Sequence, residues 1–391
     1  MSRAIDQNGI IIILSKYSRN ELKKLKRKNI KYYCLICKKR MILKVGERKR
    51  PHFSHLKLKQ KVNNGKETEH HKLGTDLLYR SFVNQGFYTK KEHYIPSIKQ
   101  RPDVVVAINN ESYAFEFQLS KISLSLFKKR TFNLKDAGFK PIWLLSSKLL
   151  VMKNNNRVKL TPFLSQFIHQ FSKIHPPQLF FYHPEQKKVI ILEHILFYSE
   201  KYAYVQKRII KVSELSIDLL KNARELNVKS LLYFWQREKF KFRTKPRNYA
   251  RGTEYQWRLW LYKKNIHFEN LPAHIYLPTR NNYVFKVPPW NWQSRIYLTI
   301  IQPLKVDDVF YYEDCINVIK KYLIPKSHYP LIKYYPSALI NYLNLLTYLN
   351  IIKPISHHKY IKINQSNFNQ ALKNLLIADD DIINQLLYNL N

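Results

Sequence analysis

The stretch from Lys99 to Ser120 is predicted to form a β-hairpin at the centre of the fold; its sequence is KQRPDVVVAINNESYAFEFQLS. Two short apolar runs, Val104–Ile108 and Tyr113–Leu119, flank the polar cluster Asn109–Ser112. β-Branched and aromatic runs around an Asn-rich turn are typical of paired antiparallel strands. The stretch therefore predicts a hairpin around which the neighbouring segments pack.

The hairpin brings acidic side chains together, because side chains alternate between the two faces of a strand. A two- or four-residue turn centred on Asn110 and Glu111 sets the register. Asp103 then lies opposite Gln118 and diagonal to Glu116, whereas an odd-length turn would flip the register. Buried carboxylates need partners, and a divalent cation is a natural one for two of them. The alternative is a solvated face without function, but the other residues on this face are apolar: Val105, Ala107 and Ala114.

The chain is strongly basic. Its 391 residues include 68 Lys and Arg against 27 Asp and Glu, a formal net charge of +41. This balance favours a nucleic acid, which basic side chains hold through phosphate contacts. A codon bias toward Lys is another explanation of the positive charge, but it would not account for the shortage of Asp and Glu. The alternative partners are a membrane surface and a ribosome.

The N-terminal region carries a candidate zinc site. Two residues separate Cys34 from Cys37, two separate His52 from His55, and a hairpin-length spacer lies between the pairs. Paired Cys and His side chains are a common ligand set for tetrahedral Zn²⁺. We predict a zinc-ribbon-like β element with structural Zn²⁺; the alternative is two free cysteines and two surface histidines.

Cysteine content and hydropathy bear on localisation. Three cysteines are too few for a disulfide framework, which favours a reducing compartment. The N-terminus lacks the features of a cleavable signal peptide, and no apolar run approaches the ~20 residues that span a bilayer. We expect a cytoplasmic protein with no membrane insertion.

The segments around the hairpin complete an α/β unit. Residues 66–86 predict a helix, residues 87–95 a strand, a helix ends near Asp136, and Lys140–Ser146 is a buried strand. The order helix, strand, hairpin, helix, strand is that of a small α/β nuclease core. In that chemistry Asp103 and Glu116 hold Mg²⁺ (or Mn²⁺), which lowers the pKa of an attacking water. Glu69 would be an outer ligand or would orient the water.

Several motifs in order make the chain similar to a known family. They are C-x-x-C, PHFSH, an E-x-E-H helix start, R-P-D, E-F-Q-x-S and a final strand containing Trp, between about Tyr32 and Ser146. Together they resemble the competence protein CoiA family, a branch of the PD-(D/E)XK nuclease superfamily. The resemblance implies a cytoplasmic DNA-processing protein that acts on incoming DNA during natural transformation and recombination.

The resemblance also assigns roles to residues. It places the metal-binding acids of the superfamily on Asp103 and Glu116, the helical Glu on Glu69 and the catalytic Lys on Gln118. Lysine would supply positive charge to the transition state, whereas glutamine supplies a neutral amide. The alternative is a site that binds DNA without cutting it. Three neighbouring cations are candidates to replace the charge: Lys121, Lys72 and Arg101.

The C-terminal half interleaves basic and aromatic residues between Phe234 and Trp260. Lys and Arg side chains can hold a DNA backbone while aromatic rings stack on unpaired nucleobases. The alternative is that the aromatic rings form a hydrophobic core. Residues 178–195 read as a second hairpin that turns at Pro184–Lys187, and the segments after Cys315 look helical. The predicted DNA-binding residues are Arg101, Lys121, Arg130, Arg243, Arg247 and Trp257.

These patterns predict three regions. Residues 1–62 form the zinc-ribbon-like element, 63–165 an α/β nuclease-like core of the PD-(D/E)XK type, and 166–391 a basic, mainly α-helical C-terminal region. We expect single-stranded or branched DNA as the substrate, with recombination proteins as partners. The protein is then either a metal-dependent deoxyribonuclease or a non-catalytic single-stranded DNA-binding adaptor. A basic RNA-binding or ribosome-associated protein is a third hypothesis.

Overall fold

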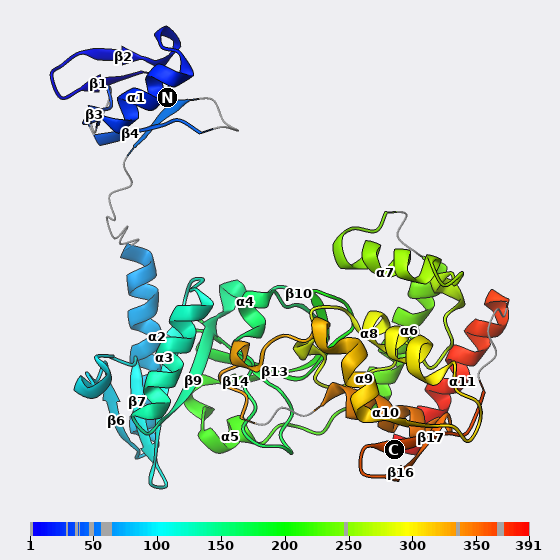
Figure 1. The fold of residues 1–391 in the computed structure, drawn as a ribbon. Coiled ribbons are helices and arrows are strands. Elements are labelled where there is room, and N and C mark those ends of the chain that lie inside the picture. Colours follow the sequence, from blue (N-terminus) through cyan, green and yellow to red (C-terminus); the bar gives the residue numbers. More distant parts are fainter. Residues whose placement is uncertain are drawn as a thin grey trace. The chain divides into compact units, whose positions relative to one another are not determined.

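The computed structural model describes residues 3–28, 30–35, 38, 40–46, 51–55, 65–245, 249–333, 337–365 and 371–390. The chain divides into two compact units, Met1–Thr68 and Glu69–Asn391. We describe each unit by itself (Figure 1).

The smaller unit is an antiparallel five-stranded sheet in the order β2-β1-β3-β4-β5, with one α-helix. Helix α1 begins with a capping box in which Ser18 and Glu21 each accept a backbone N–H at the helix start. Leu22 of α1 and Phe53 of β5 belong to its apolar core. The elements are β1 Arg3–Asp6, β2 Ile11–Ile13, α1 Arg19–Arg27, β3 Tyr32–Tyr33, β4 Arg40–Lys44 and β5 His52–His55.

The larger unit is built on a nine-stranded sheet in the order β10-β11-β14-β13-β12-β9-β8-β7-β6. Its strands pair antiparallel except at β8–β9 and β9–β12, which are parallel. The strands are β6 Tyr88–Lys91, β7 Val104–Ile108, β8 Glu111–Gln118, β9 Phe139–Ser146, β10 Met152–Asn154, β11 Arg157–Lys159, β12 Leu179–His183, β13 Lys188–Phe197 and β14 Tyr202–Lys211.

Two helices cover the two faces of this sheet near the hairpin β7–β8. Helix α2 (Gly65–Asn84) places Phe82 against Phe115 on one face, with ring centroids 4.9 Å apart. Helix α3 (Leu124–Asp136) places Phe127 against Trp143 on the other face, at 5.1 Å. The predicted order of helix, strand, hairpin, helix and strand is therefore present.

The sheet continues past residue 165, where we expected the nuclease-like core to end. Strand β12 pairs in parallel with β9, so that Phe181 lies opposite Leu145. The physical reason is that β9 is apolar along most of its length, and both of its edges are hydrogen-bonded, to β8 and to β12. The second hairpin predicted from the sequence is present as β12–β13, but it belongs to this sheet.

The remainder of the larger unit is mainly helical, as expected, and its helices after residue 227 lie at the end of the unit opposite to β6 and β7 (Figure 1). A small sheet in the order β15-β17-β16 accompanies these helices. No helix among the described residues is long and apolar enough to cross a membrane. The elements are α4 Pro162–Ser165, α5 Ile217–Lys221, α6 Val228–Thr244, α7 Gly252–Tyr262, α8 Pro289–Ile296, β15 Val309–Tyr311, α9 Tyr312–Ile319, α10 Ala338–Tyr348, β16 Ile352–Ser356, β17 Lys359–Lys362 and α11 Leu372–Leu390.

Candidate active site

A two-residue turn sets the register of the hairpin β7–β8. Asn109 and Asn110 both have positive φ, 49° and 61°, and Ile108 pairs with Glu111. Asn tolerates this left-handed conformation, and such turns match the twist of paired strands. The turn is therefore centred one residue earlier than we predicted.

The shift of the turn changes which residues face each other. Val104 pairs with Phe115, so the next position along the ladder sets Asp103 opposite Glu116. The prediction that Asp103 lies opposite Gln118 is wrong by two residues. The two acids stay neighbours, although Asp103 contacts His71 of α2 and Glu116 contacts Arg130 of α3.

Asp103 lies at the end of β7, where the ladder with β8 stops. Its Oδ2 accepts a hydrogen bond from the backbone N–H of Phe117 at 2.7 Å and thus takes the place of a strand partner. The same oxygen lies 3.3 Å from Nε2 of His71 on α2. The Asp103 side chain is 13% exposed, so it is held in place and still reaches solvent.

Glu116 is a buried carboxylate with only part of its bonding capacity used. Its side chain is 2% exposed, and Oε2 forms an ion pair with Arg130 of α3. Its Oε1 is buried without a hydrogen-bond partner among the described residues. Burial raises the pKa of this carboxyl to about 8, a shift that Arg130 opposes and the Asp103 charge adds to. The single cation at Glu116, Arg130, therefore does not offset the effect of burial on this carboxyl.

Helix α2 brings His71 to the acidic pair because it packs closely on β8. A Cβ added to Gly74 would lie 2.5 Å from the Phe117 ring, so only glycine fits there without movement. One turn earlier, the His71 ring stacks on Phe117 with centroids 5.9 Å apart. The hydrogen bond with Asp103 raises the pKa of His71, against the opposing effect of burial. His71 was not among the predicted site residues, although the pair of histidines at 70 and 71 was visible in the sequence.

The cations expected to replace the missing lysine do not pair with the acids. Lys72, Arg101 and Lys121 are all exposed, and Arg101 lies over the Tyr94 ring at 5.8 Å. Arg130 contacts Glu116 instead, and its guanidinium lies 5.1 Å from the Trp143 ring centroid.

The two remaining predicted catalytic residues differ in their surroundings. Gln118 is 8% exposed, and its Nε2 donates to the Ser120 carbonyl at 2.7 Å, so the amide is held near the end of β8. Glu69 is exposed in the first turns of α2, and no contact links it to Asp103 or Glu116 within the described part of the chain.

The acidic pair could hold one divalent cation. Among the residues that the structure describes, no group of three or more Cys, His, Asp and Glu side chains is placed to hold a metal. Asp103 and Glu116 nevertheless follow the last β7–β8 pair, Val104–Phe115, at opposing strand positions, and Glu116 Oε1 is buried without a hydrogen-bond partner in the described part of the chain. Mg²⁺ prefers a few carboxylate oxygens and keeps several waters, so two acids are enough to anchor it.

The predicted zinc ligands lie partly outside the described residues. Cys34 is buried at the end of β3, Cys37 is not among the described residues, and His52 and His55 are both in β5. The zinc site therefore stays a prediction.

The predicted DNA-binding residues of the C-terminal half are buried where the structure describes them. Trp257 is 1% exposed and donates its Nε1–H to Ser294 Oγ at 2.8 Å. Arg243 is 3% exposed and is held by both oxygens of Asp379, on α11. These two side chains hold the helical core together, so neither is available to contact DNA; Arg247 lies outside the described residues.

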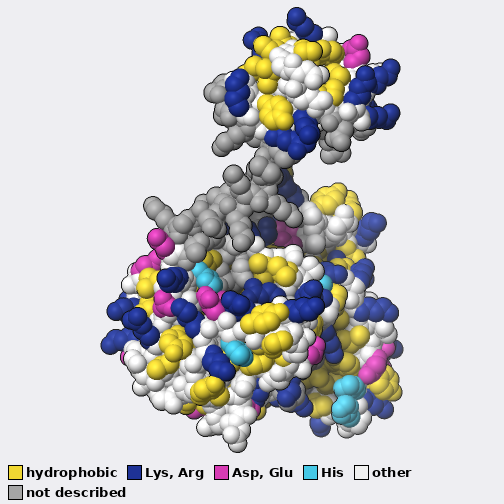
Figure 2. All heavy atoms as spheres, turned by 90° about the vertical axis from the view of Figure 1, so that its left-hand side faces the viewer, with side chains coloured by type: hydrophobic (Ala, Val, Ile, Leu, Met, Phe, Trp, Pro, Cys, Tyr) yellow, Lys and Arg dark blue, Asp and Glu magenta, His cyan; other side chains and the backbone are white. Residues whose placement is uncertain are grey.

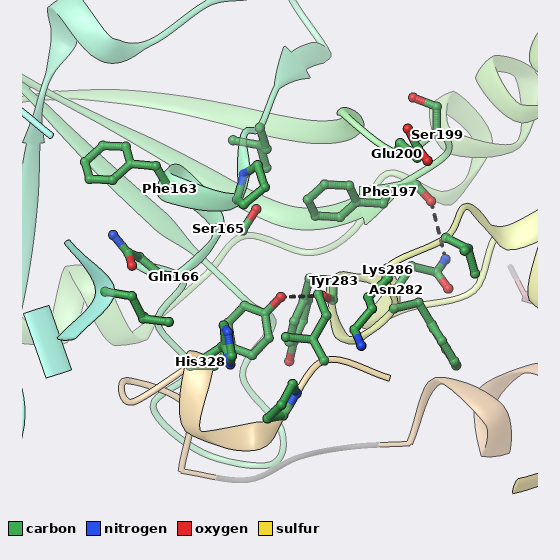
Figure 3. A pocket seen from close by; sticks show the side chains of 18 of the residues that line it. Phe163, Ser165, Gln166, Phe197, Ser199, Glu200, Asn282, Tyr283, Lys286 and His328 are labelled. Atoms are coloured by element: carbon green, nitrogen blue, oxygen red, sulfur yellow. Dashed lines mark hydrogen bonds between the residues drawn. The ribbon is translucent and has the colours of Figure 1, made fainter. Parts of the chain in front are cut away.

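The cavity with a volume near 740 Å³ lies away from the acidic pair (Figure 3). Phe163, Phe197 and Tyr283 line it, with Gln166 and His328 on the side shown at the left of the view. Its lining is mostly apolar, and neither Asp103 nor Glu116 belongs to it. The acidic pair is therefore not part of this cavity.

Family models of three CoiA domains match consecutive parts of the chain. The nuclease-like domain of competence protein CoiA matches residues 67–225, the N-terminal domain matches 14–60 and the C-terminal domain matches 232–376. Competence protein CoiA of Bacillus subtilis (strain 168) is 29% identical over 278 residues, which cover 70% of this chain and 73% of that protein.

The fold and these matches define a competence-related protein with a nuclease-like domain. The chain belongs to the CoiA family of competence proteins. The family predicted from the motifs is thus confirmed. The nuclease-like match ends at residue 225, beyond the last strand of the large sheet. The PD-(D/E)XK type of this domain and the zinc-ribbon character of the N-terminal unit stay predictions.

Proposed function

We propose that this protein processes DNA taken up during natural transformation, in the cytoplasm, through a Mg²⁺-dependent nuclease-like site at Asp103 and Glu116. One observation carries the proposal: Glu116 Oε1 is buried without a hydrogen-bond partner among the described residues, at the strand position opposite Asp103. A buried carboxylate oxygen that accepts no hydrogen bond is costly, and a bound cation would remove that cost.

Different residues at such a site would bind the metal, orient its ligands and supply positive charge. Asp103 and Glu116 would hold Mg²⁺ (or Mn²⁺), which lowers the pKa of a bound water and neutralises charge on the phosphodiester. The contact with His71 and the Phe117 N–H fix the orientation of the Asp103 carboxylate. Arg130 supplies the positive charge that Gln118 does not, because the Gln118 amide is neutral and donates to Ser120.

Substrate binding would use the basic surface around the acidic pair. Arg101 precedes Asp103 by two residues, Lys121 follows the end of β8, and both are exposed. Lys and Arg side chains are spread over the face of the larger unit that includes this end of the sheet (Figure 2). Phosphate contacts of this kind hold DNA without reading its sequence.

The test is cleavage of labelled single-stranded and branched DNA with Mg²⁺ or Mn²⁺ by the purified protein and its Glu116→Gln variant. We expect metal-dependent cleavage that is lost in this variant, since the change removes the charge and keeps the shape. Glu111→Gln is the matched control, because Glu111 lies on the same strand, is 39% exposed and pairs with Lys140. Cleavage that survives in Glu116→Gln would exclude this site as its source.

A second candidate function is a single-stranded DNA-binding adaptor that helps recombination proteins without cutting. The Arg130–Glu116 ion pair favours it, because a cation already occupies one oxygen of the candidate metal ligand. In this case the wild-type protein binds DNA tightly, neither metal produces cleavage, and Glu116→Gln binds DNA as the wild type does.

We also propose a structural Zn²⁺ in the N-terminal unit, held by the predicted tetrahedral set of Cys34, Cys37, His52 and His55. Burial of Cys34 next to the core of this unit supports a structural rather than a reactive thiol. Metal analysis of the purified protein should find zinc, and Cys34→Ser should lose it. Cys315→Ser is the matched control, because Cys315 is a buried thiol of the other unit.

A further inference from the structure

A second pocket lies at the end of the larger unit opposite to the acidic pair. It has a volume of about 260 Å³ and is bounded by the β10–β14 edge of the sheet, by α6 and α7, and by the start of α8. Three residues of α6 and its C-cap residue line the pocket at helical spacing, so one face of the end of this helix forms a wall: Glu238, Lys241, Phe242 and the C-cap Lys245.

Aromatic side chains form the inner wall of this pocket. Trp290 packs on Trp257 with ring centroids 4.4 Å apart, and Phe242 lies 6.0 Å from Trp290. Trp257 is buried and acts as a support, whereas Trp290 and Phe242 keep part of their surface exposed. The pocket therefore offers flat apolar surfaces to a ligand.

The charges around the pocket are mainly positive. Five basic side chains line it against two acids, and both acids are already paired. Glu238 contacts Lys241 at 2.7 Å and Arg157 at 3.4 Å, and Glu254 contacts Arg258 at 2.7 Å.

Two lysines are left over after this pairing. Lys153 and Lys245 are exposed, and in the described part of the chain neither has an acidic partner. Lys153 lies 4.6 Å over the ring of Tyr202, at the mouth of the pocket. The rim thus has positive charge to spare for an anion.

We infer that this pocket takes a base of single-stranded DNA, with the neighbouring phosphates on Lys153 and Lys245. Aromatic rings that stack on a base beside cations that hold the backbone are the combination single-strand binding surfaces use. A duplex would not enter, because its bases are already stacked and paired. The inference rests on the proposed function in that the substrate is DNA, but it concerns a site separate from the acidic pair.

The first test compares two ligands on the unmodified full-length protein. One is labelled oligo-dT, and the other is an abasic oligomer with the same length and the same phosphates. We expect the abasic oligomer to bind roughly tenfold more weakly, since stacking on an aromatic residue contributes of that order for each base. Equal affinity for the two would overturn the inference.

The second test uses paired variants. Trp290→Leu should weaken oligo-dT binding roughly tenfold and abolish the difference between oligo-dT and the abasic oligomer. Lys245→Ala should weaken both ligands equally, through the lost phosphate contact. The controls are Phe240→Leu and Arg237→Ala, two exposed residues of α6 that do not line the pocket. If Trp290→Leu unfolds the protein, as its thermal melt would reveal, the comparison of the two ligands still decides.

The outcomes separate this inference from the proposed nuclease. Base-dependent binding without any cleavage supports the pocket and argues against the enzyme. Cleavage together with equal binding of oligo-dT and the abasic oligomer supports the nuclease and argues against the base-binding pocket. If no DNA binds at all, both are wrong.

Discussion

Three acids are buried among the described residues, and they differ in the number of cations that contact them. Glu193 contacts Arg208 at 2.7 Å and Arg224 at 3.2 Å. Asp379 likewise has two cations, whereas Glu116 has one and faces a second carboxylate. Glu116 therefore has less positive charge around it than Glu193 and Asp379, as expected of a residue that binds an additional cation.

Asp379 provides a prediction for stability. Asp379→Ala would leave Arg243 and Lys239 buried without their counter-charge, and removal of one partner of a buried ion pair costs about 3–5 kcal/mol. We expect the free energy of unfolding, measured in urea, to fall by that amount. Asp381→Ala is the control, since Asp381 is exposed on the same helix and its replacement should change stability by no more than about 0.5 kcal/mol.

His274 provides a prediction for pH dependence. Burial, with help from nearby Lys239, Lys362 and Arg243, lowers the pKa of His274 to about 3. The unfolded chain takes up this proton near pH 6.5 and the folded chain only near pH 3. The free energy of unfolding therefore falls as the pH drops through this window, by up to about 1.4 kcal/mol per pH unit for one proton.

His274→Phe should flatten this dependence. Urea unfolding at several pH values between 6.5 and 4 would show a slope lower by up to one proton. Replacement of the exposed His357 by Gln should leave the slope unchanged. An unchanged slope in His274→Phe would mean that this histidine does not stay neutral in the folded protein.

At the scale of elements, the contact between α2 and β8 positions the candidate site. Gly74→Ala should destabilise the protein by about 1–2 kcal/mol, because overpacking against Phe117 outweighs the gain in helix propensity. Urea unfolding measures the loss, and a Gly74→Ala, Phe117→Leu double variant should recover part of it. Full additivity of the two changes would contradict the close contact.

The elements near the hairpin could be predicted from the sequence, and their partners could not. The runs at 104–108 and 140–146 form the strands β7 and β9, because short, mostly apolar runs of this length are typical of buried strands. The cation on Glu116 comes from α3, fourteen residues along the chain. Contacts between elements depend on how a helix is rotated on the sheet, which local patterns do not fix.

Helix α7 explains why the C-terminal DNA-binding residues were misplaced. Trp257 and Leu261 face the core, while Tyr255, Leu259 and Tyr262 are exposed on the same helix. Both sets are apolar, so the sequence does not reveal which set is buried. In the structure Trp257 is buried, whereas Trp290 is partly exposed and its ring can contact a ligand.

At the scale of the whole molecule, the charge of +41 predicts binding that depends strongly on salt. Each cation that contacts a phosphate of single-stranded DNA adds about 0.7 to the slope of log affinity against log salt concentration. An Arg101→Ala, Lys121→Ala variant should therefore lower this slope by about 1.4 in titrations with single-stranded DNA. Lys373→Ala, an exposed change on α11, is the control. A slope that is the same in all three proteins would place the DNA elsewhere.

The pairing order of the large sheet has a consequence for how the chain reaches its native state. In the hairpin, Val106 pairs with Tyr113, seven positions later, whereas at the far edge Val158 pairs with Ala203, forty-five positions later. Distant pairings close larger loops and form more slowly. We expect the hairpin that carries the acidic pair to form early, at a stage when β11 is not yet paired with β14 and exposes a free strand edge. An unpaired strand edge can pair with another chain. Rapid synthesis at high protein concentration would therefore cause aggregation through β11, and it would affect the hairpin later.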